Sequence, residues 1–153
     1  GMWWVYFVVP AAPLLRAYRR KSFKFGYGHI PIFGAIVATG AGLHAAAYYI
    51  EHHSKLGSVE TVLTVAIPVG IYLLGIFALY MYLVQAFDTF HILLVAGSAA
   101  FLIAAVLLAA AGVTMAVCLL VVMLAPAVVV VGYEMVGHRH AEDAIGAALS
   151  REL

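Results

Sequence analysis

The chain has 153 residues, of which 66% are hydrophobic and 10% are charged, and its mean hydropathy is +1.08. Soluble domains carry charge on about a quarter of their residues, so this composition excludes a soluble globular protein and indicates an integral membrane protein. The formal net charge is only +1, and the eight Lys and Arg residues form no uniform basic field, which argues against nucleic acid as a partner.

The first apolar segment, residues 2–15, is too short to cross a membrane by itself. As a helix its fourteen residues reach about 21 Å, against the roughly 30 Å of a hydrocarbon core. Pro10 and Pro13 weaken a helix there. Its aromatic residues are of the kind that prefer the membrane interface: Trp3, Trp4, Tyr6 and Phe7. We expect either an interfacial or re-entrant segment or a truncated helix.

A basic stretch at residues 16–24 follows and contains five of the eight Lys and Arg residues. Basic residues beside a membrane span stay on the cytoplasmic side, so this stretch predicts the orientation of the protein.

Four longer apolar segments come next, at about residues 30–50, 61–84, 91–112 and 113–136, and each is long enough to cross the bilayer. Pro31 is expected in the first turn of its helix, where its missing N–H costs nothing. The sequence therefore predicts an all-α integral membrane bundle of four transmembrane helices plus the short N-terminal helix, in one domain covering residues 1–153.

The topology that follows is internally consistent. Four spans return the tail, residues 137–153, to the cytoplasm, so that seven of the eight basic residues lie inside and only Lys55 outside. The tail fits either a short amphipathic helix on the inner surface or a frayed terminus. Gly112 is the expected turn between the third and fourth spans.

Small residues recur every four positions at Gly34, Ala38 and Gly42. On one helical face they allow a neighbouring helix to approach closely, and they suggest a homo-oligomer as one kind of assembly. The alternative is that Gly and Ala are simply common in membrane helices.

Polar residues fall into two layers under this topology. The inner layer contains Asp88, His91 and Glu134, which are candidate binding residues together with His44 on the outer side. His44 is about 9 Å from the outer end of its helix, and a polar residue at that depth normally faces the bundle interior and marks a pathway or ligand site. The alternative is a histidine held by one interhelical hydrogen bond.

A metal site is a second interpretation of the outer layer. On a continuous helix His44, Glu51 and His52 share one face at spacings i, i+7 and i+8, and His53 is adjacent. Imidazole and carboxylate ligands suit zinc or iron. The alternative is that residues at the end of a span are polar because they are solvated, and no cofactor is then expected.

Two motifs resemble a known family. The cluster MWWVYF places Trp3, Trp4, Tyr6 and Phe7 before the basic stretch, and YGHIPIFGAIVATGAGL places Tyr27, His29 and Pro31 at the entry to a glycine-rich helix. Both resemble the later half of the bacterial low-temperature-requirement A proteins. The resemblance implies a polytopic protein of the bacterial inner membrane that is linked to growth at low temperature and stress.

The chain also departs from that family. Val8 stands where the family usually carries an acid, and family members are about twice as long, so the chain resembles a C-terminal portion or a shortened relative. The family has no settled biochemical activity, and the resemblance supplies a compartment and a fold more than a mechanism.

Three functions remain open at this point. The first is a membrane protein that handles a small solute, an ion or a lipid within its bundle. The second is a membrane-embedded metal enzyme, although the sequence has no hydrolase triad, CxxC, HExxH or phosphate-binding loop. The third is a structural bundle that oligomerises through its small residues.

Overall fold

The computed structural model describes residues 2–8, 22–84 and 89–137, and these ranges contain helices and no strand. The helices are α1 (Met2–Val8), α3 (Ser22–Ile50), α4 (Ser58–Val84), α5 (Thr89–Ala110), α6 (Met115–Gly132) and the short π-helical turn η2 (Tyr133–Gly137). Within the described ranges, α3, α4, α5 and α6 are long and apolar enough to cross a membrane. The predicted all-α membrane bundle is confirmed.

The first long helix begins earlier than the sequence suggested. α3 starts at Ser22, so Pro31 lies inside the helix and its predicted place in the first turn is wrong. One reason is that aromatic side chains pair one turn apart in the added segment, where the rings of Phe23 and Tyr27 lie 4.7 Å from centre to centre. Contacts at i and i+4 of this kind stabilise a helix.

The seam between α3 and α4 has a seven-residue repeat. Its buried positions on α3 alternate in steps of three and four residues: Ile32, Ala35, Thr39, Gly42 and Ala46. This spacing keeps one stripe of a helix against its neighbour. Gly42 lies at the closest approach, because a Cβ atom there would be 2.7 Å from the carbonyl carbon of Thr64 on α4.

The predicted stripe of Gly34, Ala38 and Gly42 is therefore only partly correct. Gly34 and Ala38 are exposed, and nothing lies within 4 Å of a Cβ atom placed at Gly34. Steps of four residues rotate by about 40° around a helix each time, so such a stripe leaves a straight seam after one or two turns. Oligomerisation through these exposed small residues stays a prediction.

The end of α3 is capped by an unusual residue. The His53 N–H donates to the Tyr48 carbonyl oxygen at 2.9 Å and the His52 N–H donates to the Tyr49 carbonyl oxygen at 3.1 Å. This is the Schellman pattern, whose turning residue adopts the left-handed conformation and is usually glycine. Here that residue is His52, with φ of 59°.

The end of α5 has the same cap with the usual residue. Gly112 has φ of 78°, its N–H donates to the Ala109 carbonyl oxygen at 3.1 Å, and the Val113 N–H donates to the Leu108 carbonyl oxygen at 3.0 Å. The predicted turn at Gly112 is confirmed.

Substitutions in these two caps are expected to change the stability of the protein in opposite directions. His52→Gly should raise the stability of the protein by about 1 kcal/mol, because a left-handed conformation costs a residue with a Cβ atom about that much. Gly112→Ala should lower it by about the same amount for the same reason. Thermal unfolding in detergent micelles measures both, and a shift of the two melting temperatures in the same direction would contradict the assignment of these caps.

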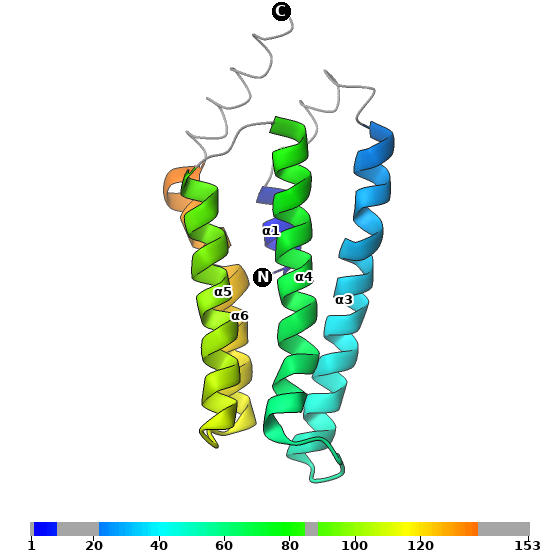
Figure 1. The fold of residues 1–153 in the computed structure, drawn as a ribbon, viewed down its shortest axis with the longest axis vertical. Coiled ribbons are helices and arrows are strands. Elements are labelled where there is room, and N and C mark those ends of the chain that lie inside the picture. The colour runs from blue at the N-terminus through cyan, green and yellow to red at the C-terminus, as the bar shows by residue number, and fades with distance from the viewer. Residues whose placement is uncertain (1, 9–21, 85–88, 138–153) are drawn as a thin grey trace, which may run out of the picture.

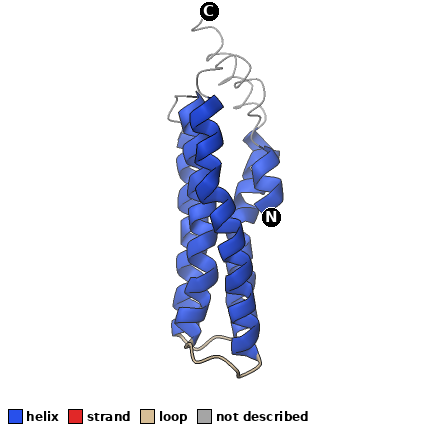
Figure 2. Ribbon diagram, turned by 90° about the vertical axis from the view of Figure 1, so that its right-hand side faces the viewer, coloured by secondary structure: helices blue, strands red, loops and turns tan. Residues whose placement is uncertain are grey.

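The long helices form two hairpins that stand side by side (Figure 1). α3 and α4 make one hairpin and α5 and α6 the other, with α4 facing α5 across the centre. The connection at residues 51–57 and the turn at residues 111–114 lie at the same end of the bundle (Figure 1). Seen from the side, α1 lies beside the half of the bundle farther from these connections (Figure 2).

Helix α1 is inserted among the long helices. Its Val5 is completely buried, and the Tyr72 hydroxyl of α4 donates a hydrogen bond to the Met2 carbonyl oxygen. Tyr72 is close to the middle of α4, so Met2 lies near the middle of the bundle's depth. This depth favours an inserted segment over an interfacial one. Residues 9–21 and the predicted tail helix lie outside the described residues.

Candidate functional site

Among the histidines that the structure describes, the most enclosed is His91, in the first turn of α5. The side chain is 5% exposed, and its Nε2 shares a hydrogen bond with the hydroxyl of Tyr133 in η2. The Tyr80 ring of α4 stacks on it, with 4.4 Å between ring centres and 22° between ring planes. The edges of Phe77 and Phe90 also contact it. These contacts fix the position of the imidazole at one end of α5.

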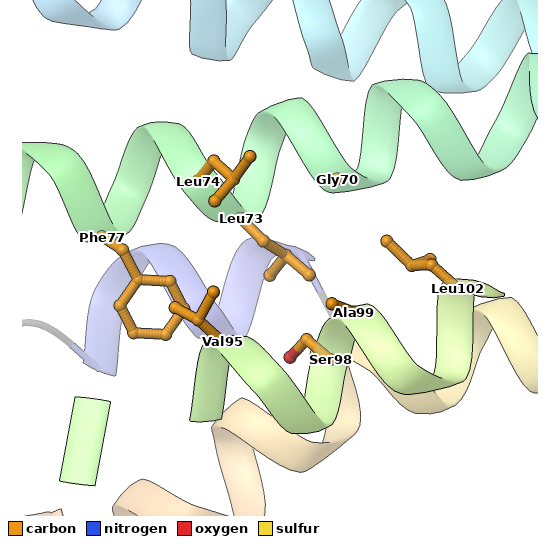
Figure 3. Close-up of a pocket in the computed structure, with 8 residues that line it drawn as sticks. All are labelled: Gly70, Leu73, Leu74, Phe77, Val95, Ser98, Ala99 and Leu102. Carbon is orange, nitrogen blue, oxygen red and sulfur yellow. The ribbon is translucent and has the colours of Figure 1, made fainter. Parts of the chain in front are cut away.

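A groove opens beside His91 between α4 and α5. Its largest part has a volume of about 440 Å³, within the usual range of ligand pockets, and is lined by His91 with Leu74, Phe77, Met81, Ile92 and Val95 among others. A narrower part of about 120 Å³ shares Leu74, Phe77 and Val95 with it and continues to Leu102. Figure 3 shows the narrow part, with side chains of α4 and α5 facing each other across it.

A third part of about 260 Å³ shares Leu102 with the narrow part and extends to Leu107. We call the three parts together the lateral groove, lined by residues between Leu63 and Met81 on α4 and between His91 and Leu107 on α5. Along α5 this is sixteen residue steps, or about 24 Å at 1.5 Å per residue. The groove therefore follows most of the length of a membrane span.

The lining of the lateral groove is almost entirely apolar. Its polar side chains are His91 at one end and Ser98 near the middle. The Ser98 hydroxyl donates to the Ala125 carbonyl oxygen of α6 at 2.9 Å, so its proton is already used. Ile92 and Ile103, both on the rim, are more than half exposed, so the groove opens toward the outside of the bundle. This lining suits a ligand that has a hydrocarbon chain along the groove and a polar group near His91.

His44, by contrast, does not face the bundle interior. It is exposed, and its ring lies 4.8 Å from that of Tyr48 on the same helix. The expected interior position is wrong because His44 is two residues after Gly42, and two residues turn a helix by about 200°. The seam that buries Gly42 therefore points His44 outward. Its role in binding stays a prediction.

The residues of the predicted metal site are separated by the end of α3. The helix ends at Ile50, so Glu51 and His52 lie in a turn, and the helical face that they were expected to share with His44 does not exist. His53 Nδ1 lies 3.6 Å from Glu51 Oε2, and both side chains are well exposed. No group of three or more His, Cys, Asp or Glu side chains in the described ranges is arranged to hold a metal ion. A zinc or iron site remains untested as a prediction.

The other two predicted binding residues have different outcomes. Glu134 is exposed on η2, and the Trp4 Nε1–H of α1 donates to its Oε1 at 3.4 Å. It lies next to Tyr133, the partner of His91, which sequence reasoning missed because a tyrosine in an apolar run gives no signal of its own. Asp88 lies outside the described residues.

Comparison with known proteins adds a family. The family model for bacterial low temperature requirement A protein (LtrA) matches residues 1–126 of the chain. The chain belongs to the LtrA family. It is therefore a multi-pass membrane protein of a family linked to low temperature. No curated protein and no solved structure matches the chain.

The two LtrA-like motifs meet in space. Tyr6 of the aromatic cluster hydrogen-bonds to His29 of the helix-entry motif, with 3.0 Å between the hydroxyl oxygen and Nε2, although the residues are 23 positions apart. His29 Nδ1 lies 2.7 Å from the Phe25 carbonyl oxygen and donates to it. Nε2 is then the acceptor for the Tyr6 hydroxyl in the neutral imidazole. In this LtrA protein the motifs join α1 to α3.

Proposed function

We propose that this LtrA-family chain is a multi-pass protein of the bacterial cell membrane that binds the acyl chain of an inner-leaflet lipid in the lateral groove. The observation that carries this proposal is the lining of the groove between Leu107 and His91, in which the one other polar side chain is Ser98, whose hydroxyl already donates to the Ala125 carbonyl oxygen. Lipid is thereby favoured over the ion or polar solute that the sequence left open, because those ligands need several polar partners when they leave water.

The length of the two parts of the groove nearest His91 supports one leaflet as the source of the lipid. From His91 to Leu102 the two adjoining parts cover eleven residue steps of α5, or about 16 Å. This is about half of a hydrocarbon core that is roughly 30 Å thick. A lipid whose head lies beside His91 would place its acyl chain along this length.

The inner leaflet is favoured by the charge of the sequence. The start of α3, next to the basic stretch at residues 16–24, lies at the same end of the bundle as the start of α5. Basic residues beside spans stay in the cytoplasm, so the basic stretch and the C-terminus are proposed to be cytoplasmic. His91 would then lie near the cytoplasmic interface, where a lipid head is found.

A tryptophan placed in the groove tests the proposal. Ala96 lines the largest part of the groove, and Ala96→Trp should fill this part and exclude the acyl chain of the lipid. We expect lipid that copurifies with the wild-type protein in a mild detergent, measured by native mass spectrometry, to fall about tenfold in this variant, which corresponds to about 1.4 kcal/mol of binding.

The matched control is Ala41→Trp. Ala41 is exposed on α3 and lines no part of the lateral groove, so its replacement should leave the bound lipid unchanged. Wild-type protein without bound lipid, or equal loss of lipid in both variants, would refute the proposed site.

A further inference from the structure

We propose that α1 holds the two hairpins at the spacing that keeps the lateral groove open, with Trp4 and Tyr6 as its positioning residues. The effect on lipid rests on the proposed function, whereas the effect on spacing does not. α1 lies behind the seam between α4 and α5, on the side away from the viewer in Figure 1, and its ribbon passes behind the groove residues in Figure 3. We call its two sets of hydrogen bonds the α1 clasp.

One half of the clasp holds the first hairpin. The Tyr6 hydroxyl donates to Nε2 of His29, which is 7% exposed, and the Tyr72 hydroxyl of α4 donates to the Met2 carbonyl oxygen. The His29 ring cannot turn freely, because its Nδ1 donates to the Phe25 carbonyl oxygen at 2.7 Å. These bonds fix α1 against both α3 and α4.

The other half of the clasp reaches the second hairpin at the polar end of the groove. Trp4 donates to Glu134, and the next residue back in the chain, Tyr133, shares the hydrogen bond with His91. α1 also packs on α6. A movement of α1 would therefore displace Glu134 and the adjacent Tyr133. Through the hydrogen bond of Tyr133 it would also displace the His91 imidazole, which lines the groove.

The completely buried Val5 lies between these two halves. A helix bonded to α3 and α4 on one side and to η2 on the other limits how closely the hairpins can approach behind the groove. This limit explains how α4 and α5 can leave open space between them on the face of the bundle opposite α1, whereas packed interiors normally leave little.

The experiment measures the spacing and the lipid separately. Spin labels at Ile71→Cys on α4 and Leu93→Cys on α5, both exposed and outside the groove lining, are introduced in a Cys118→Ala background. In the double variant Trp4→Phe, Tyr6→Phe, pulsed electron paramagnetic resonance should show a distance that shifts or broadens by about 2 Å, the size of helix movements at interfaces. Copurified lipid should fall about fivefold, the low end of usual coupling between sites.

Two controls separate positioning from a general loss of stability. Trp3→Phe makes the same change at the neighbouring tryptophan, which is 71% exposed and contacts Phe7, and should change neither measurement. Gly112→Ala should lower the melting temperature without moving the labels.

Each outcome has a definite meaning. An unchanged distance in the double variant overturns the clasp. A changed distance with an unchanged amount of bound lipid overturns the claim that this spacing keeps the lateral groove open for lipid. A changed distance in a protein that holds no lipid even in its wild-type form supports the clasp as a spacer and overturns the proposed function alone.

Discussion

Gly42→Ala is expected to lower the free energy of unfolding by about 1–3 kcal/mol, the usual cost of overpacking a tight interior. A Cβ atom at this position would lie 2.7 Å from the carbonyl carbon of Thr64 and 3.0 Å from the backbone nitrogen of Val65. Both are backbone atoms, so the clash cannot be relieved by a side-chain rotation and the two helices must separate. Thermal unfolding in detergent or in nanodiscs measures the effect.

The control is Gly34→Ala, two turns earlier on the same helix. Nothing lies within 4 Å of a Cβ atom there, so the substitution should be neutral or should stabilise the helix by up to about 1 kcal/mol through higher helix propensity. If both substitutions destabilise the protein equally, the register of the seam between α3 and α4 is wrong.

His91→Ala is expected to cost about 3 kcal/mol, as for the removal of other large buried rings. The substitution removes the stacking on Tyr80, the edge contacts with Phe77 and Phe90, and the hydrogen bond with Tyr133. Because the ring is nearly enclosed, little of the resulting space can be filled without moving α4 or η2. The melting temperature should therefore fall clearly.

The matched control is His44→Ala, which removes the same side chain from an exposed position. Its ring contacts Tyr48 on its own helix, so the expected change is within about 0.5 kcal/mol. A large loss of stability at His44 with none at His91 would reverse this assignment and restore the interior position that the sequence suggested for His44.

The sequence by itself determined the class of the protein and the approximate extent of its spans. Long apolar runs must be helical in a bilayer, because no water is present to satisfy the backbone, so hydropathy alone is enough to predict the helices. The Gly112 turn was also predictable, since glycine is the usual residue with positive φ at the end of a helix. The two family motifs could be recognised in the sequence, but the contact between them could not be predicted from it.

Only the tertiary structure decided which face of each helix points inward. In a soluble protein the apolar face marks the interior, but lipid is as apolar as a packed core, so both faces of these helices look alike in sequence. This is why Gly34 and His44 were expected inside and lie outside, while His91 is buried against Tyr133. The lateral groove depends on the spacing of two hairpins, and that spacing is set by contacts between distant parts of the chain such as Tyr6 and His29.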